Sequence, residues 1–449
     1  MKKVITYGTY DFFHEGHYRL LKRAKELGDY LIVGVTTDNY DDSRGKLNVQ
    51  QDIMKRIENI KNSGLADEII IEEYEGQKIN DILKYNIDIF AIGSDWIGKF
   101  DYLKEYCEVV YLERTKGISS TELRAKNNGI LSLGLVGYGR IANRFIKESK
   151  FVSGVNVEGV FGPNPISLDH FVKEHELAFY SLDYDEFLEK IDAVYIASPH
   201  LTHYEYVKKA LAKGKHVLCE KPMVLSAQQS QEVYRLAKRQ DCVLLEAIKT
   251  AYAPGFIRLI SVAKSGLIGK IKNIDATFTK LVEGNLRELN PKHAGGSVTE
   301  LASYPLLAII KLLGQDIENT TFYSYYDSEK EIDLFTKINL EYKDAIATAK
   351  VGLGVKSEGD LIISGTKGYI YVPSPWWKTE YFEMRFENFG ENKKYYQKFE
   401  GDGLRYELAE FVSMINKGNM KTYKLNPDES TKINSIIEEF LLGKNIKKI

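Results

Sequence analysis

Two histidines near the start of the chain, His14 and His17, enclose a Glu-Gly pair. They follow a short apolar run and precede a helical pattern, which predicts a strand-to-helix turn. At such a turn Gly16 permits close backbone approach, and the helix N-terminus favours a bound phosphate. Nucleotidyl transfer needs charge stabilisation on the phosphate and the leaving group more than covalent help. The pattern is therefore typical of nucleotidyl transfer, with both imidazoles facing one phosphate chain.

A second polar run, residues 114–121, begins about a hundred residues later and again lies between a strand and a helix. Its arginine, Arg114, can bind two phosphate oxygens, and the residues after it offer hydroxyl and backbone donors. The histidines alone would also suit an incidental pair or a metal pair, although no third ligand lies nearby. The second run favours a phosphate site, with nucleotide contacts predicted at Thr115, Ser119 and Ser120. Lys46, in the polar stretch 41–48, is predicted as a catalytic cation, and Arg56 as a contact to the acceptor phosphate or the nucleotide.

A glycine-rich turn follows the apolar run 130–136 and opens a helical pattern. A lone Gly-x-Gly-x-x-Ala run is weak evidence, but this strand-to-helix position is the one that a nicotinamide dinucleotide requires. Two further polar segments, each after a predicted strand, support this interpretation. His200 and His203 are interpreted as cofactor-side or structural groups rather than metal ligands. The predicted cofactor contacts are Gly137, Gly139, Arg140, Ile141, Ser198, Pro199, His203 and Glu220.

Composition restricts the class of protein. The chain has 449 residues, 44% of them hydrophobic, and a net charge of −2. No basic field exists to recruit nucleic acid, so nucleotides are expected as small molecules. The three cysteines are widely spaced and suit a reducing compartment. No signal-peptide pattern and no long apolar stretch occur, so we expect a cytoplasmic protein without membrane insertion.

The element pattern predicts an α/β fold with three domains: 1–128, 129–255 and 256–449. The first two alternate strands with helices, as in parallel sheets covered on both faces. From about residue 257 the strands alternate apolar and polar residues, which predicts a largely antiparallel open sheet and a homo-oligomer. One helix is expected at Thr299–Leu313 and another at Tyr406–Asn416. Expected strands include Val4–Tyr7, Tyr30–Val35, Glu68–Glu72, Ile87–Ile92, Glu108–Leu112, Val155–Phe161, Ala193–Ser198, His216–Cys219, Val243–Leu245, Ile271–Phe278, Ile317–Tyr325, Thr336–Tyr342, Ile346–Val351, Asp360–Ser364 and Tyr369–Val372.

Residues 1–126 resemble the glycerol-3-phosphate cytidylyltransferases of the HxGH nucleotidyltransferase superfamily. Besides the runs above, the resemblance includes Gly8–Asp11, Thr37-Asp38 and the segment Gly93–Phe100. It implies CTP with Mg²⁺, in-line attack by an acceptor phosphate, and no covalent enzyme intermediate. Ser94 departs from a usually acidic position, and 41–52 also diverges, which leaves the acceptor open. The resemblance adds nucleotide contacts at Thr9, Tyr10 and Asp95 and a metal contact through the nucleotide at Asp11.

Residues 130–449 resemble the Gfo/Idh/MocA oxidoreductases, chiefly through the Glu-Lys-Pro triplet at Glu220–Pro222. The resemblance implies that Lys221 is the central catalytic residue, beside the nicotinamide. Glu300 and Tyr304 lie four residues apart, on one face of the expected helix. Tyr304 is expected to donate a proton to a carbonyl, with Lys221 lowering its pKa. Glu158 is expected within a strand, so NAD and NADP both remain open.

Together the two halves predict a bifunctional transferase and oxidoreductase acting on small molecules. NAD(P)H-dependent reduction of a sugar phosphate would give an alditol phosphate. CTP-dependent cytidylyl transfer would then give a CDP-alditol and pyrophosphate, for teichoic acid, cell-wall or capsule biosynthesis. Alternatively, the reductase acts on the CDP-linked product or an unrelated sugar, or the second half is a nicotinamide sensor.

Overall fold

The computed structural model describes residues 1–37, 40–41, 46–49, 51–113, 130–284, 286–327, 329 and 331–449. The chain forms two compact units. The first unit contains Met1–Gly134 and Phe145–Asp192, and the second contains Leu135–Arg144 and Ala193–Ile449. The polar run 114–121, expected between a strand and a helix, lies outside the described residues. The three predicted domains, with boundaries after residues 128 and 255, stay a prediction.

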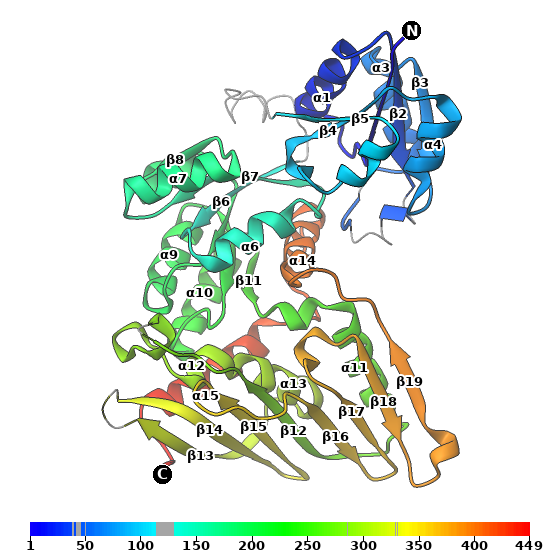
Figure 1. Ribbon diagram of the computed structural model, residues 1–449. Helices are drawn as coiled ribbons and strands as arrows, with labels where there is room; N and C mark the ends of the chain where they lie inside the picture. Colours follow the sequence, from blue (N-terminus) through cyan, green and yellow to red (C-terminus); the bar gives the residue numbers. More distant parts are fainter. Residues whose placement is uncertain are drawn as a thin grey trace. The chain divides into compact units, whose positions relative to one another are not determined.

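The first sheet has five parallel strands in the order β3-β2-β1-β4-β5 (Figure 1). The four central residues of β1 are fully buried, as expected for a strand covered on both faces. Because β1 is the middle strand, its carboxyl end leads into α1 at the centre of the sheet edge. The elements are β1 (Lys3–Gly8), α1 (Glu15–Glu26), β2 (Tyr30–Thr36), α3 (Ile53–Ser63), β3 (Glu68–Glu72), α4 (Gln77–Tyr85), β4 (Ile89–Gly93), η1 (Ser94–Trp96), η2 (Asp101–Glu105) and β5 (Glu108–Leu112).

The second sheet has six strands in the order β11-β10-β9-β6-β7-β8. Parallel pairing of β10 with β9 and β11, and of β7 with β8, confirms the predicted parallel character. The short strand β8 was not expected from the sequence. The elements are β6 (Leu131–Val136), α6 (Arg140–Ser149), β7 (Val155–Phe161), α7 (Pro165–His175), β8 (Phe179–Ser181), α8 (Tyr184–Glu189), β9 (Ala193–Ile196), α9 (His200–Ala212), β10 (His216–Glu220), α10 (Ala227–Arg239), β11 (Leu244–Ala247), η3 (Lys249–Tyr252) and α11 (Pro254–Lys264).

The third sheet has nine strands in the order β19-β18-β17-β16-β12-β15-β14-β13-β20 (Figure 1). Most pairs are antiparallel, as predicted, but β12 pairs in parallel with β15, and β13 with β20. Helix α13 packs on β12 and β15. The elements are β12 (Ile271–Thr279), η4 (Arg287–Leu289), η5 (Pro291–His293), α12 (Ser297–Leu301), α13 (Ser303–Leu313), β13 (Ile317–Asp327), β14 (Ile332–Tyr342), β15 (Ala345–Gly352), β16 (Leu361–Gly365), β17 (Tyr369–Val372), η6 (Trp376–Lys378), β18 (Tyr381–Arg385), η7 (Phe389–Glu391), β19 (Lys393–Tyr396), α14 (Leu404–Lys417), α15 (Pro427–Leu441) and β20 (Ile446–Lys448).

The single helix expected at Thr299–Leu313 is wrong, because two helices, α12 and α13, occupy this stretch. A continuous helix would place Pro305 in its interior, where the ring clashes with the carbonyl of Leu301 and the N–H is missing. The chain avoids this by starting a new helix, which puts Pro305 in the first turn of α13. Glu300 and Tyr304 therefore lie on consecutive helices.

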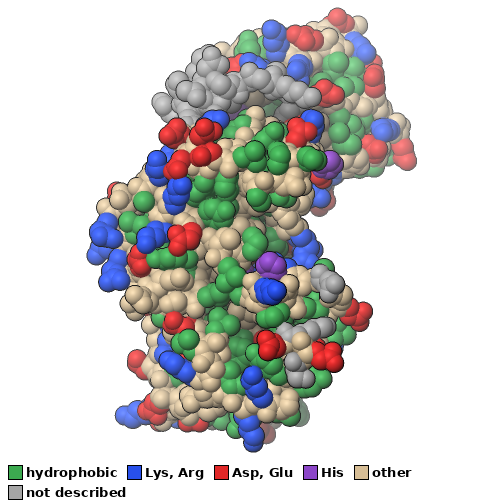
Figure 2. All heavy atoms as spheres, turned by 90° about the vertical axis from the view of Figure 1, so that its left-hand side faces the viewer, with side chains coloured by type: hydrophobic (Ala, Val, Ile, Leu, Met, Phe, Trp, Pro, Cys, Tyr) green, Lys and Arg blue, Asp and Glu red, His purple; other side chains and the backbone are tan. Residues whose placement is uncertain are grey.

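In the described part of the chain, no single helix has the length and apolar composition to cross a membrane. The bent pair Pro291–Leu301 and Ser303–Leu313 reaches that threshold together, with an angle of 42° between its halves. Nearly all of α13 is buried in the second unit. On the face drawn in Figure 2, basic and acidic side chains are mixed, in keeping with the small net charge.

Candidate functional sites

The two histidines of the first site lie at the start of α1, in a fixed arrangement. His14 is the N-cap, and its Nδ1 accepts a hydrogen bond from the backbone N–H of Gly16 at 3.1 Å. His17 Nδ1 lies 3.4 Å from the backbone nitrogen of His14, and the two rings stack with centroids 3.8 Å apart. An imidazole that accepts at Nδ1 carries its proton on Nε2 when neutral. Both rings can thus donate from Nε2 to phosphate oxygens.

Lys46 lies close to this histidine pair. Burial, His14 and Lys46 together lower the pKa of His17 well below its ordinary value, so His17 is neutral at pH 7. The Lys46 ammonium donates to the carbonyl oxygen of Lys150 at 2.8 Å. The next residue, Leu47, forms a β-bridge with Val152 inside the same unit. The structure thus places Lys46 near enough to His17 to affect its pKa, and the catalytic role of Lys46 stays a prediction.

The turn between β1 and α1 has a strained backbone. Tyr10 and Phe12 have φ angles of 54° and 46°, in the left-handed region that non-glycine residues rarely adopt. Such strain is commonly held at functional turns. The Tyr10 side chain is buried and its ring packs edge-on against His17, so Tyr10 can offer only its backbone to a nucleotide. Asp11 Oδ1 accepts from the backbone N–H of Gln51 at 2.9 Å.

The prediction that Arg56 contacts the acceptor or the nucleotide is wrong, because its side chain is fully buried. Its Nη1 donates to the carbonyl oxygens of Thr9 at 2.8 Å and Thr36 at 2.9 Å. Its Nε donates to Gln51 O at 3.0 Å, and Nη1 lies 3.6 Å from Asp41 Oδ2. Arg56 therefore joins the carboxyl ends of β1 and β2 beneath the site.

Replacing Arg56 with methionine should lower the free energy of unfolding by about 3 kcal/mol, because the buried Asp41 carboxylate would lose its cation. The effect is measured by urea unfolding of the full chain, followed by circular dichroism. The control is Arg19→Met, which breaks a partly exposed helix pair with Glu15 and should cost less than about 0.5 kcal/mol. Equal losses in the two variants would contradict the assignment.

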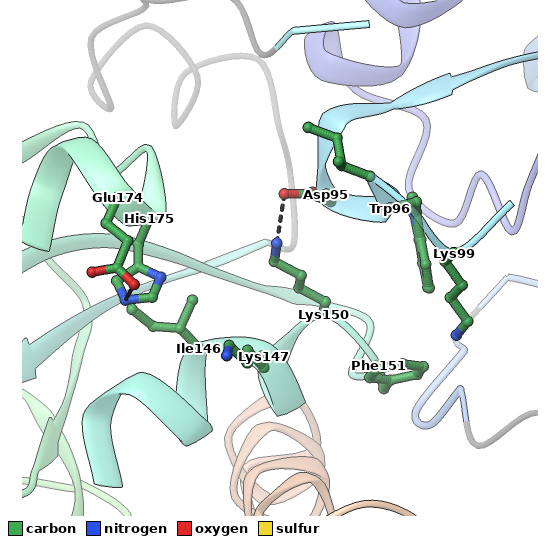
Figure 3. Close-up of a pocket in the computed structure, with 10 residues that line it drawn as sticks. Asp95, Trp96, Lys99, Ile146, Lys147, Lys150, Phe151, Glu174 and His175 are labelled. Atoms are coloured by element: carbon green, nitrogen blue, oxygen red, sulfur yellow. Dashed lines mark hydrogen bonds and ion pairs between the residues drawn. The ribbon is translucent and has the colours of Figure 1, made fainter. Parts of the chain in front are cut away.

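Asp95, in η1, lies beside a cavity of about 440 Å³ in the first unit (Figure 3). Its Oδ1 accepts from the Lys150 ammonium at 2.6 Å, and the two side chains point toward each other in Figure 3. Trp96 and Phe151 line the same cavity with rings packed edge-on, 5.9 Å apart. Four other predicted site residues lie outside the described residues: Arg114, Thr115, Ser119 and Ser120.

The second site begins at the glycine turn before α6. Gly137 has a φ of 98°, and an added Cβ would lie 2.9 Å from the carbonyl oxygen of Ala197. A Cβ at Gly139 would meet no atom within 4 Å. The first glycine is thus required for packing, and the second leaves bare backbone facing open space. With α6 beginning at Arg140 and continuing through Ile141, this turn fits a dinucleotide pyrophosphate at the helix N-terminus.

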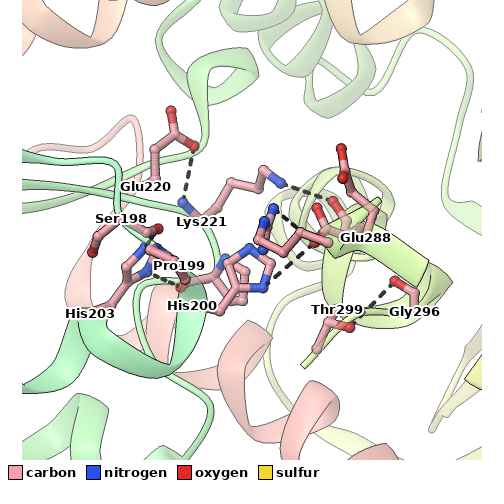
Figure 4. A network of polar contacts seen from close by, with 12 residues as sticks. Ser198, Pro199, His200, His203, Glu220, Lys221, Glu288, Gly296 and Thr299 are labelled. Carbon is pink, nitrogen blue, oxygen red and sulfur yellow. Dashed lines mark hydrogen bonds and ion pairs between the residues drawn. The ribbon is translucent and has the colours of Figure 1, made fainter. Parts of the chain in front are cut away.

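His203 connects two loops of this site (Figure 4). Its Nε2 lies 2.8 Å from Ser198 O, and its Nδ1 lies 2.9 Å from Pro222 O. Burial lowers the pKa of His203 to about 4, so the ring is neutral and donates to one of these carbonyls at a time. Its side chain is fully buried, so it holds the Ser198–Pro199 turn, which begins α9, against the turn at Lys221.

The structure brings Lys221, Glu300 and Tyr304 together. The Lys221 ammonium donates to the carbonyl oxygen of Glu300 at 2.9 Å and lies 5.7 Å from the centre of the Tyr304 ring. Glu220 Oε2 accepts from the backbone N–H of Lys221 at 3.3 Å (Figure 4). Its Oε1 accepts from the Tyr195 hydroxyl at 2.6 Å. Lys221 therefore extends from the end of β10 to the end of α12.

The prediction that Lys221 lowers the pKa of Tyr304 is wrong for this structure. Burial, followed by Glu220, Glu407 and Glu300, raises the pKa of Tyr304 well above its ordinary value. These negative charges and the loss of water both disfavour a phenolate. The Tyr304 phenol accordingly stays protonated at neutral pH, as a proton donor must.

Glu300 also contacts two basic side chains. Its Oε1 lies 3.1 Å from Arg287 Nη2 and 3.8 Å from His200 Nδ1. Burial, then His203, Lys221 and Arg287, lower the pKa of His200 well below its ordinary value, so this ring is neutral. Sequence reasoning missed Arg287. The stretch 280–293 gives no clear signal for it, because its basic side chains alternate with Glu283 and Glu288.

Asp333, a residue of β14 that no motif indicates, holds α12 in place. Its Oδ2 accepts from the backbone N–H of Val298 and from the Thr336 hydroxyl, both at 3.0 Å. Ser297 donates its hydroxyl to Asp333 O, also at 3.0 Å. Since α12 carries Glu300, Asp333 positions that residue. Burial raises the pKa of Asp333 from 3.8 to about 7.

This shift predicts a pH dependence of stability. With a pKa raised in the folded state, Asp333 contributes stability that is fully present below pH 3.8 and is lost as pH rises to about 7. Asp333→Asn keeps the acceptor oxygen and removes the proton. Relative to this variant, the wild type should lose up to about 1.4 kcal/mol of unfolding free energy per pH unit in that window. Denaturant unfolding at pH 5, 6 and 7 measures the difference, and a pH-independent difference would contradict it.

Comparison with known families agrees with the two predicted activities. Residues 5–126 match the family described as cytidylyltransferase-like, and residues 131–247 match an oxidoreductase family with an NAD-binding Rossmann fold. Residues 256–371 match the GFO/IDH/MocA C-terminal domain. Glycerol-3-phosphate cytidylyltransferase of Bacillus spizizenii is 54% identical over 125 residues, which are 28% of this chain and 95% of that protein.

The remainder of the chain resembles oxidoreductases over almost their whole length. The scyllo-inositol 2-dehydrogenase (NADP(+)) of Bacillus subtilis is 24% identical over 337 residues, covering 69% of this chain and 96% of that protein. A solved 3-ketoreductase from Actinomadura kijaniata, in complex with NADP and TDP-benzene, superimposes with a TM-score of 0.65 at 18% identity. The match covers 71% of this chain and 99% of the other, and it shows the shared fold. The chain therefore belongs to two families in succession, the cytidylyltransferases in residues 5–126 and the GFO/IDH/MocA oxidoreductases in residues 131–371.

Proposed function

We propose that the chain performs two consecutive steps on one substrate. The second site reduces the carbonyl of a sugar phosphate with NAD(P)H, which gives an alditol phosphate. The first site then transfers CMP from CTP to that phosphate, which gives a CDP-alditol and pyrophosphate. One observation carries the proposal: the same chain stacks the rings of His14 and His17 at one site and holds the Lys221 ammonium over the Tyr304 ring at the other. Reduction supplies the polyol phosphate that cytidylyl transfer consumes.

In the transfer step, an oxygen of the acceptor phosphate attacks the α-phosphate of CTP and pyrophosphate leaves. The Nε2 donors of His14 and His17, with the Lys46 ammonium, would stabilise the charge on the phosphates. Among the described residues, no three His, Cys, Asp or Glu side chains gather as a metal cage. Mg²⁺ bound mainly through nucleotide phosphates suits this arrangement, with Asp11 as the proposed protein contact.

In the reduction step, a bound nicotinamide would supply the hydride. The Tyr304 phenol donates its proton to the carbonyl oxygen, and the Lys221 ammonium stabilises the negative charge that develops there. The carbonyl of Glu300 holds the Lys221 ammonium in position before the substrate arrives. Glu158 is buried within β7 and does not lie at the end of that strand. It is therefore not placed to bind the ribose 2′-hydroxyl that distinguishes NAD from NADP. NADH and NADPH are therefore both candidates.

The test incubates the purified chain with CTP, Mg²⁺, NADH or NADPH, and a panel of three- to six-carbon aldose and ketose phosphates. Nicotinamide absorbance and product mass are followed together. Cofactor oxidation with a CDP-alditol two hydrogens heavier than the CDP-sugar supports the proposal and names the substrate. Oxidation only after a CDP-linked product has formed would reverse the order of steps. If CDP-glycerol forms from glycerol phosphate but no substrate causes cofactor oxidation, the proposed reduction is wrong. The second half would then act on another sugar or serve as a nicotinamide sensor.

A further inference from the structure

Three basic side chains in the second unit surround two buried carboxylates beside the reductase site. Arg140 Nη2 lies 2.9 Å from Glu288 Oε1, and Lys280 Nζ lies 3.8 Å from the same oxygen. Arg287 Nη2 lies 3.1 Å from Glu300 Oε1. They come from different parts of the sequence: the start of α6, the residue after β12, and η4. Three cations thus share two carboxylates.

The layering of these charges leaves the cations open to a ligand. The carboxylate side chains are only 9% exposed, whereas Lys280 is 39% exposed and Arg287 is 35% exposed. The glutamates therefore lie beneath and the cations face solvent. Arg287 Nη1 is itself buried, and no described protein atom accepts a hydrogen bond from it. Burial and the neighbouring Arg140 lower the pKa of Lys280, which indicates that positive charge is crowded here.

We propose that Lys280 and Arg287 bind the phosphate group of the reductase substrate. This assignment rests on the function proposed above, in which that substrate is a sugar phosphate. A guanidinium can donate two parallel hydrogen bonds to phosphate oxygens, and an ammonium adds a point charge. Arg287 contacts the Glu300 side chain, while Lys221 contacts the Glu300 carbonyl. Glu300 thus lies between Arg287 and Lys221. A single sugar phosphate would place its phosphate at Arg287 and its carbonyl at Lys221.

The same cations could also meet the pyrophosphate of the dinucleotide. Arg140 begins α6 directly after the glycine turn, so it suits that pyrophosphate. Lys280 and Arg287 come instead from the segment between β12 and α12, next to the residues that act on the carbonyl. For this reason we assign these two residues to the substrate. Binding of the substrate phosphate and binding of the dinucleotide pyrophosphate predict different kinetic effects.

The experiment compares Lys280→Met and Arg287→Met with wild type, since methionine keeps an unbranched apolar chain without the charge. For each protein, kcat/KM is measured for a ketose phosphate and for the same ketose without phosphate, at saturating NAD(P)H. The ratio of the two values should fall at least about 30-fold in each variant, because charge-assisted hydrogen bonds to phosphate are lost. Lys272→Met, an exposed β12 lysine near Asp344, is the matched control and should leave the ratio unchanged.

Two results would overturn the assignment. An unchanged ratio would show that Lys280 and Arg287 act through the site structure and not through the substrate phosphate. The KM for NAD(P)H is measured in a separate titration. A raised KM for NAD(P)H, with the ratio unchanged, would assign the two residues to the dinucleotide phosphates.

A binding measurement separates this proposal from the proposed function. Inorganic phosphate is titrated calorimetrically into the NADP⁺ complex of wild type and of Lys280→Met. Because the cytidylyltransferase site also binds phosphate, only the heat that disappears with Lys280→Met reports on this site. Loss of that heat supports the anion site even when no sugar phosphate is reduced, in which case the proposed function alone fails. Equal heat in both proteins overturns the anion site.

Discussion

Replacing Lys221 with alanine is expected to slow NAD(P)H oxidation by at least about 1000-fold, because the developing oxyanion loses its ammonium donor. In the free protein the side chain donates to the Glu300 carbonyl and lies over the Tyr304 ring. Neither contact is to a buried charge, so the variant should fold. CTP turnover should stay within about twofold of wild type, since Lys221 lies in the second unit whereas His14 and His17 lie in the first.

Both activities are measured on the same preparation, by nicotinamide absorbance and by pyrophosphate release. Lys238→Ala, at the exposed end of α10, is the matched control and should alter neither rate. If Lys221→Ala keeps full reductase activity, the assignment of this lysine is wrong. If both activities fall together, the two halves are coupled more tightly than independent sites would be.

The second large effect is expected at the histidine pair. His14→Ala should lower the rate of cytidylyl transfer by at least about 1000-fold, because an Nε2 donor to the phosphates is lost. The Gly16 N–H also loses its acceptor, which loosens the start of α1. His17→Ala should have a similar effect, and the double variant should be little worse than either single one, since groups that act as a unit are not additive.

Pyrophosphate release from CTP and glycerol 3-phosphate measures this effect. The control is His170→Ala, a histidine of α7 with an 80% exposed side chain, which should leave the rate unchanged. Reductase activity of the His14 variant should match that of wild type. Strictly additive losses at His14 and His17 would contradict a shared phosphate contact.

Apart from the short strand β8, the sequence predicted the strands of both parallel sheets, because fully buried strands are continuous apolar runs with clear ends. It also located the residues of the motifs, since His14, His17, Lys221 and Tyr304 each lie in or near a recognisable pattern. It failed where burial decides a residue's role. Arg56 has the chemistry of a phosphate ligand, but its side chain is enclosed by β1 and β2.

Other misses come from contacts between distant segments. Asp333 reaches α12 from β14, and no local pattern shows that pairing. The pKa of Tyr304 depends on Glu407, which is about a hundred residues further along the chain. The break between α12 and α13 was also missed, although the sequence contains a signal for it: Pro305 is incompatible with the interior of a continuous helix.

The bridge between Leu47 and Val152 affects how the two activities can be separated experimentally. Leu47 also donates its N–H to Phe151 O at 2.7 Å, and Asn48 donates to Ser153 O at 3.1 Å. A truncated protein that ends at residue 128 would lack all of these partners and would leave the segment next to Lys46 unsupported. Its catalytic constants would then describe an altered loop as well as an isolated domain. Point variants in the 449-residue chain are therefore the better way to silence one activity at a time.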